Sequence, residues 1–227
     1  MVAGQTGVGK SSLVNALAKE IQAPVDALPA TSGFRVYGLQ HAGFPSAVLV
    51  DSPGLDASSA SRDALIAQAT ESDLILWLVP AHRADRQIDA TAIAAMQRAV
   101  ADARKGSPLP VIAVLSNIDR LRPIQEWTPP YDLRSTTQPK AISIRQAIEA
   151  VSNDLAMPPD DIIPVSLRDA AAYNIDALWA RIFMLAPEVQ RAQLSRRIAD
   201  SRATLDWKRV WSQATGAGRV VARTLLK

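Results

Sequence analysis

Two kinds of hydrophobic pattern alternate along this chain of 227 residues. Short apolar runs have the length of buried strands, and longer segments repeat apolar residues at helical spacing. The predicted strands are residues 34–40, 47–50, 73–79, 110–115 and 162–166. The predicted helices are residues 12–18, 61–71, 85–105, 141–156 and 175–185. This alternation predicts a three-layer, doubly wound α/β sheet, mostly parallel, with its site at the carboxyl ends of the strands.

Several segments depart from the alternation. Only residues 1–3 precede the first turn, so the first strand is either short or already under way where the chain begins. Prolines 24 and 29 predict a loop that runs to about residue 32. The strands at 34–40 and 47–50 are joined by a turn, and this hairpin predicts one antiparallel edge strand. Four prolines in residues 121–140 predict an irregular insertion, to which we assign no role.

Composition narrows the chemistry. Hydrophobic residues make up 48% and charged residues 21% of the chain, and no apolar run approaches the length of a membrane span. The chain has no cysteine, which excludes disulfides, thiolate metal sites and cysteine nucleophiles. Its two histidines, His41 and His82, lie in separate segments, so a histidine-based metal site is not expected. We expect a cytoplasmic protein, either free or peripheral to a membrane.

The net charge of +3 is concentrated at one end of the chain. Residues 191–227 hold nine Lys or Arg and two Asp or Glu, whereas the preceding residues are slightly acidic. We therefore predict a main domain over residues 1–186 and a basic helical extension over residues 187–227. Three interpretations of the extension stay open: a helix packed on the main domain, a contact with a membrane surface, and a contact with RNA.

Residues 4–11 read Gly-Gln-Thr-Gly-Val-Gly-Lys-Ser and match the phosphate-binding pattern G-x-x-x-x-G-K-[ST]. Glycines let the backbone curl until successive N–H groups point at phosphate oxygens, Lys10 adds a positive charge, and the Ser11 hydroxyl can ligate Mg²⁺. The alternative is a glycine-rich turn that matches by chance, but the helix that follows is the context the motif requires. The predicted phosphate-binding residues are Gln5, Thr6, Gly7, Val8, Gly9, Lys10, Ser11 and Ser12.

A second motif, Asp51-Ser52-Pro53-Gly54, directly follows the buried strand at 47–50. A carboxylate at the end of a strand suits a magnesium ion, and a glycine three residues later can bring its N–H close to a γ-phosphate. Alone the pattern is usually only a turn, but it stands about forty residues after a phosphate loop. We expect Asp51 to hold Mg²⁺ through water and Gly54 to sense the γ-phosphate.

Two further motifs complete a resemblance to a known family. Ser116-Asn117-Ile118-Asp119 follows the strand at 110–115, and Val165-Ser166-Leu167 ends the last predicted strand. In this order the motifs resemble those of the Era-like P-loop GTPases, within the translation-factor-related class, over residues 1–186. The resemblance implies that the ligands are GTP or GDP and Mg²⁺. It implies that Ser11, Thr31 and Asp51 hold the metal, and that Lys10, Thr31 and Gly54 act on the γ-phosphate.

The fourth motif distinguishes the bases. Asp119 can accept hydrogen bonds from N1–H and the 2-amino group of guanine, and adenine offers no such pair; the loss costs roughly 1–3 kcal/mol. The family usually has lysine at the position of Asn117, so we expect guanine selectivity with weakened affinity. The alternative is a helix cap or turn after the strand. The residues predicted to recognise the base are Ser116, Asn117, Asp119, Ser166 and Leu167.

Hydrolysis has less support. The resemblance implies a water-orienting glutamine where this chain has Leu55, and a cation-recruiting Asn or Ser where it has Gly7. We expect slow hydrolysis that is stimulated by an activating protein or by self-association through the nucleotide face. The candidate charge donors Arg35, Arg62 and Arg83 are assigned no catalytic role. Two alternatives are a GTP-binding scaffold or membrane-recruitment module without turnover, and a P-loop kinase, which the later motifs disfavour.

Overall fold

A computed structural model describes most of the first 185 residues. The described ranges are 1–20, 26–28, 33–39, 47–56, 58–104, 108–135, 137–168 and 172–185. All of them belong to one compact unit, residues 1–186. Thr31, His41 and the predicted basic extension lie outside the described residues, so their predictions stay predictions.

A seven-stranded sheet in the order β2-β3-β4-β1-β5-β6-β7 forms the centre of this unit. The strands β4, β1, β5, β6 and β7 pair in parallel, whereas β3 runs antiparallel to both β2 and β4. The strands are β1 Val2–Gly4, β2 Asp26–Leu28, β3 Arg35–Leu39, β4 Ala47–Asp51, β5 Ile75–Pro80, β6 Val111–Ser116 and β7 Ile162–Pro164. The predicted doubly wound, mostly parallel sheet is confirmed.

The antiparallel strand is not at the edge, contrary to the prediction. The short strand β2, which lies within the segment predicted as loop, pairs with β3 and occupies the edge instead. Three residues are too few to show a period in sequence, and β2 forms because β3 offers it unpaired backbone groups. The antiparallel partner of β4 is therefore the second strand of the sheet.

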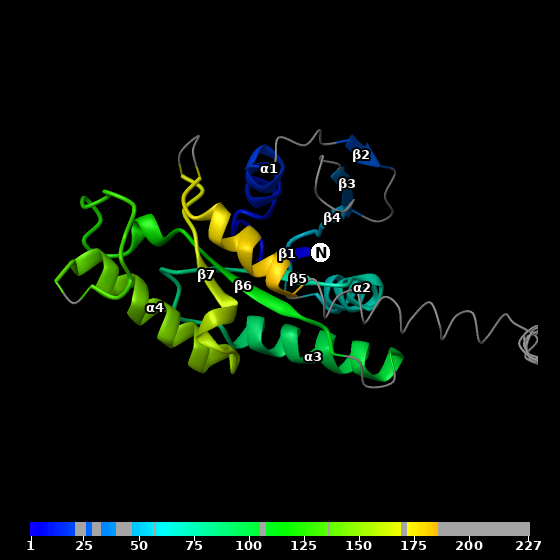
Figure 1. The fold of residues 1–227 in the computed structure, drawn as a ribbon. Helices are drawn as coiled ribbons and strands as arrows, with labels where there is room; N and C mark the ends of the chain where they lie inside the picture. The colour runs from blue at the N-terminus through cyan, green and yellow to red at the C-terminus, as the bar shows by residue number, and fades with distance from the viewer. Residues whose placement is uncertain are drawn as a thin grey trace, which may run out of the picture. The chain divides into compact units, whose positions relative to one another are not determined.

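Helices cover both faces of the sheet. They are α1 Lys10–Glu20, α2 Ser59–Glu71, α3 Gln87–Ala103, α4 Pro139–Leu155 and residues 175–185, with short 3₁₀ turns at Ile118–Arg120 and Pro159–Asp161. The helices α2, α3 and α4 lie on one face, and α1 with residues 175–185 on the other (Figure 1). The helix α2 begins two residues before its predicted start because the Ser58 side chain accepts a hydrogen bond from the Ser61 amide.

The central strands are buried on both sides, which explains their near-continuous apolar runs. On β5, Ile75, Trp77 and Val79 pack against the α2, α3 and α4 side, and Leu76 and Leu78 pack against the other side. All six residues of β5 and all six of β6 are buried. The alternation of side chains between two apolar layers fixes the register of the sheet.

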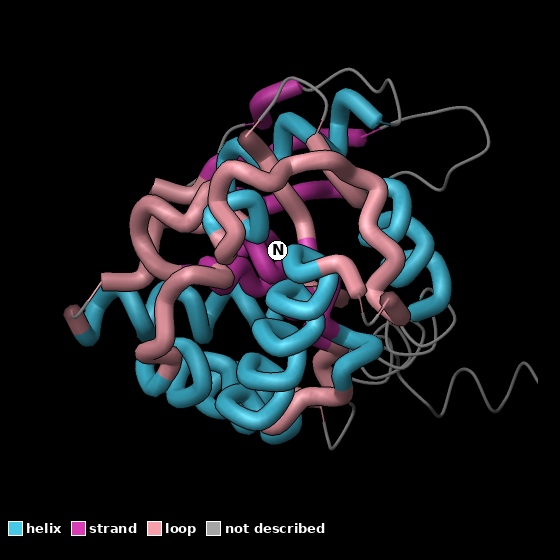
Figure 2. Tube along the Cα trace, turned by 90° about the vertical axis from the view of Figure 1, so that its left-hand side faces the viewer, coloured by secondary structure: helices cyan, strands magenta, loops and turns pink. Residues whose placement is uncertain are grey.

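Parallel pairing brings the ends of the strands to one edge. The segments that follow β1, β4, β5, β6 and β7 therefore all lie at the carboxyl edge of the sheet, where doubly wound folds place their sites. In Figure 2 the strands lie among the helices, and loops cross the side nearest the viewer. The four motifs identified in the sequence occupy these segments.

Replacing Gly4 by alanine should destabilise the protein. Gly4 has a φ of +144°, and a Cβ there would lie 2.7 Å from the carbonyl oxygen of Leu78. We expect the free energy of unfolding to fall by about 2 kcal/mol or more, measured by urea denaturation. Gly38→Ala is the matched control, because a Cβ at Gly38 would meet nothing within 4 Å. Equal stabilities of the two variants would show that the tight passage at Gly4 is not a constraint.

Candidate functional site

Lys10 organises the loop that follows β1. Its side chain is 8% exposed, and its Nζ donates hydrogen bonds to the carbonyls of Gly4 at 3.2 Å and Gln5 at 2.9 Å. An ammonium group has three donors, so one is left for an anion held by the loop. Burial lowers the pKa of Lys10, and the charge of Asp51 opposes that shift. Gly7 and Gly9 have φ of +77° and +101°, a conformation that lets loop N–H groups form an anion-binding nest.

Ser11 and Asp51 meet beside this loop. The Ser11 hydroxyl donates to Asp51 Oδ2 at 2.6 Å, and Asp51 is 4% exposed. Its other oxygen, Oδ1, is buried without a hydrogen-bond partner among the described residues. Such an orphaned carboxylate oxygen beside a hydroxyl suits a hard divalent cation such as Mg²⁺. In the described ranges no group of three or more His, Asp or Glu is placed to hold a metal ion.

The segment after β4 lies directly against the phosphate loop. A Cβ on Gly54 would be 2.6 Å from the Cα of Thr6 and would also collide with the Thr6 hydroxyl. The Leu55 amide donates to the Gly4 carbonyl at 3.0 Å, and Leu55 forms a parallel β-bridge with Gln5. The Leu55 side chain is 4% exposed and packs in the core on the α2 side. A glycine is therefore required at position 54, and the side chain at position 55 belongs to the core.

Two serines bring the later motifs to the same place. The Ser116 hydroxyl donates to the Val8 carbonyl at 3.2 Å, which ties the end of β6 to the phosphate loop. The Ser166 hydroxyl donates to Asp119 Oδ1 at 2.9 Å, and both residues are buried. Asn117 has a φ of +58°, a left-handed conformation in which asparagine is enriched. The predicted base-recognition residues thus form one cluster beside the phosphate loop.

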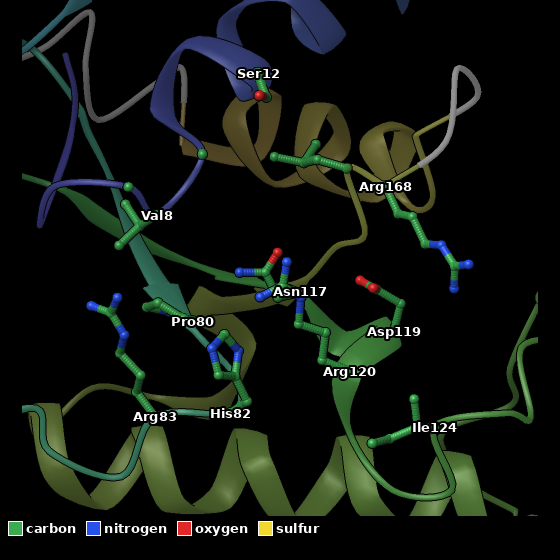
Figure 3. Close-up of a pocket in the computed structure, with 13 residues that line it drawn as sticks. Val8, Ser12, Pro80, His82, Arg83, Asn117, Asp119, Arg120, Ile124 and Arg168 are labelled. Atoms are coloured by element: carbon green, nitrogen blue, oxygen red, sulfur yellow. The ribbon is translucent and has the colours of Figure 1, made fainter.

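A cavity of about 520 Å³ opens between these motifs (Figure 3). Of the predicted residues, it is lined by Gly7, Val8, Gly9, Ser12, Asn117, Asp119 and Leu167. No motif predicted the rest of its lining, which is Pro80, His82, Arg83, Arg120, Ile124 and Arg168. They lie at the end of β5 and in the segments that follow β5, β6 and β7, and the sheet order brings these segments together. Burial lowers the pKa of His82, and the positive charges of Arg120 and Arg83 add to that effect.

A buried carboxylate on α3 accepts a hydrogen bond from the phosphate loop, and no sequence motif predicted this contact. Asp89 is 1% exposed and accepts hydrogen bonds from Gln5 Nε2 at 2.8 Å and Trp77 Nε1 at 2.9 Å. Burial raises the pKa of Asp89, and the two hydrogen bonds partly oppose that shift. Gln5, predicted as a phosphate-loop residue, thus directs its side-chain amide to α3.

The fold and these contacts define a P-loop nucleotide-binding domain. The Gly7 and Gly9 nest, Lys10 and the Ser11–Asp51 pair lie together beside the carboxyl ends of β1 and β4, and Asp119 lines the adjoining cavity. A family model described as "50S ribosome-binding GTPase" matches residues 1–117, and the chain belongs to this family. The predicted resemblance to GTPases of the Era-like group is confirmed.

Curated relatives carry the name GTPase Era. The protein from Acidimicrobium ferrooxidans is 35% identical over 124 residues, which cover 52% of this chain and 39% of the relative. The protein from Lactobacillus delbrueckii is 29% identical over 125 residues, which cover 53% of this chain and 38% of the relative. The matched segment is therefore only about two fifths of each relative's length.

The fold also resembles a solved structure of Era, in complex with MgGDPNP and nucleotides 1506–1542 of 16S ribosomal RNA. The TM-score is 0.52 at 18% identity, and the match covers 80% of this chain and 54% of that one. At this identity the likeness supports the fold alone. None of the described helices has the length and apolar character needed to cross a bilayer.

Replacing Asp89 by asparagine should change how stability depends on pH. Burial raises the pKa of Asp89 above 3.8. The contribution of Asp89 to the free energy of unfolding is therefore full below pH 3.8 and is lost as the pH rises through the raised pKa. Asparagine does not titrate. The stability of the variant relative to wild type should therefore improve as the pH rises from 3.8 through the raised pKa, measured by urea unfolding over a pH series that starts below 3.8. A constant difference across this range would argue against a raised pKa at Asp89.

Proposed function

We propose that this chain binds GTP and GDP with Mg²⁺ and hydrolyses GTP slowly, as a molecular switch. The observation that carries the proposal is the position of Asp119. This carboxylate is held by Ser166 and lines the same cavity as the glycines of the phosphate loop. A ligand with an anionic chain at one end and a hydrogen-bond donor pair at the other would satisfy both ends of this cavity. Guanine nucleotides have that chemistry.

Selection of the base rests on the acceptor character of Asp119. A carboxylate accepts hydrogen bonds from both N1–H and the 2-amino group of guanine, whereas adenine presents an acceptor at N1 and has no 2-amino group. Asn117, which is shorter than lysine, lines the cavity together with His82 and Arg83 (Figure 3). This supports the expectation that guanine is selected but held less tightly than by a lysine stem.

At the end of the cavity formed by the phosphate loop, the fold already orients the groups that would bind phosphate. Lys10 would place its remaining N–H toward the β- and γ-phosphates, and loop N–H groups would hold the oxygens. Ser11 directly, Asp51 through water and Thr31 are the proposed holders of Mg²⁺, which when bound neutralises charge on the phosphates. The contact between Gly54 and Thr6 makes the segment 52–55 the element best placed to respond to a γ-phosphate.

Slow turnover follows from the position of Leu55. Its aliphatic side chain packs in the core and can neither orient nor polarise water. Stimulation by an activating protein, or by a second copy across the nucleotide face, stays part of the proposal. The same burial favours a second candidate, a GTP-binding scaffold or membrane-recruitment module without significant turnover. The basic segment 187–227 stays a predicted contact for a membrane surface or RNA.

Replacing Asp119 by asparagine should shift preference from guanine to xanthine nucleotides. Asparagine can donate a hydrogen bond to the 2-carbonyl of xanthine but cannot accept two from guanine. We expect GDP affinity to fall by about tenfold or more and XDP affinity to rise, measured by displacement of a fluorescent nucleotide. Asp132→Asn, on the exposed part of segment 121–138, is the control. If GDP and ADP compete equally for the wild-type protein, the base assignment is wrong.

Single-turnover hydrolysis separates the switch from the scaffold. A slow GTPase should release phosphate from bound GTP at a measurable rate that increases with protein concentration if self-association contributes. Lys10→Ala is the control, because the loop loses its cation and should lose nucleotide binding. A bound, stable GTP at all concentrations, with and without potassium, would support the scaffold instead.

A further inference from the structure

Lys140 is a buried cation that belongs to none of the sequence motifs. It lies in the first turn of α4 and is 0% exposed, although lysine is almost never fully buried without partners. Burial lowers its pKa, and the negative charges of Asp119 and Glu126 oppose that shift. An interaction has to compensate for the removal of this ammonium group from water.

Three backbone carbonyls provide that compensation. The Nζ atom donates to the carbonyl of Asp119 at 2.8 Å, of Leu121 at 2.6 Å and of Pro123 at 3.2 Å. All three donors of the ammonium group are used. The Trp127 ring lies 5.7 Å from the same nitrogen and adds a cation–π contact. Three carbonyl groups of the segment from Asp119 to Pro123 thus converge on the Lys140 ammonium group.

This segment is a wall of the cavity. Asp119, Arg120 and Ile124 line the cavity, and Lys140 holds the backbone carbonyls of Asp119, Leu121 and Pro123 in the same segment. Ser166 fixes the Asp119 side chain, and Lys140 fixes its main chain, so the carboxylate is held from both ends. Recognition by two hydrogen bonds depends on sub-ångström placement of the acceptor oxygens.

We propose that Lys140 is a positioning residue that sets the guanine selectivity of the site through Asp119. The inference rests on the proposed function, because it assigns a role within guanine recognition. Lys140 does not line the cavity and acts only through the backbone it holds. Its removal should therefore weaken the contact with the 2-amino group of guanine more than the contacts with the phosphates.

Arg104 offers a matched control for a purely structural role. It also donates to three carbonyls, those of Ala69, Thr70 and Ser72, where α2 ends. Burial lowers the pKa of Arg104, as it does for Lys140. None of these four residues lines the cavity. Arg104→Met should therefore lower the melting temperature and leave base selectivity unchanged.

The experiment compares GDP, IDP and ADP affinities of the full chain by isothermal titration. IDP lacks only the 2-amino group, so the ratio of IDP to GDP dissociation constants measures that contact directly. We expect a wild-type ratio of about ten, and a ratio within about twofold of one for Lys140→Met, with the ADP affinity little changed because adenine offers Asp119 neither donor. Lys140→Gln, which keeps two donors, should give an intermediate ratio and tests the inference if Lys140→Met does not fold.

The outcomes separate the two proposals. A wild-type ratio retained by the folded Lys140→Met or Lys140→Gln variant overturns the positioning role and leaves the proposed function standing. Equal binding of GDP and ADP by the wild-type protein overturns guanine recognition, and this inference with it. A loss of selectivity in Arg104→Met as large as in Lys140→Met would mean that general destabilisation is the cause.

Discussion

The parallel pairing of β1 with β4 and β5 is the constraint on which the site depends. The registers place Val2 beside Asp51, Gly4 beside Leu78 and, on the next pair, Pro80 beside Ser116. The segments that follow β1, β4, β5 and β6 therefore lie at one edge of the sheet, where their side chains are close enough to form hydrogen bonds. The hydrogen bonds from Ser11 to Asp51 and from Ser116 to the Val8 carbonyl span 40 and 108 positions of sequence.

Beneath this edge, buried polar groups join the two ends of the candidate site. Asp89 connects the phosphate loop to α3, and Lys140 connects the segment after β6 to α4. An ion pair of 2.7 Å joins Arg86, the residue before α3, to Asp154 on α4; the two side chains are 6% and 44% exposed. A half-exposed pair of this kind contributes little stability.

Sequence patterns predicted what depends on local chemistry. Long apolar runs such as 73–79 identify central strands, and the glycine and lysine positions of residues 4–11 follow from the needs of a phosphate loop. Sequence patterns did not predict β2, because three residues are too few to show the alternation of a strand and the pairing of β2 depends on β3. They also missed Asp89 and Lys140. Whether a charged residue on a helix is buried is decided by partners far away in sequence, here Gln5, Trp77 and the carbonyls of 119–123.

The packing of Leu55 has a consequence for how hydrolysis could be assisted. The side chain belongs to the core cluster between the sheet and the α2, α3 and α4 helices, and its amide donates a hydrogen bond to the Gly4 carbonyl. A glutamine at this position would bury an amide in apolar surroundings, at a cost of about 1–3 kcal/mol, before it could orient any water. Restoring the missing residue type alone would therefore not restore its function. Assistance to the attacking water therefore has to come from a group other than the side chain at position 55.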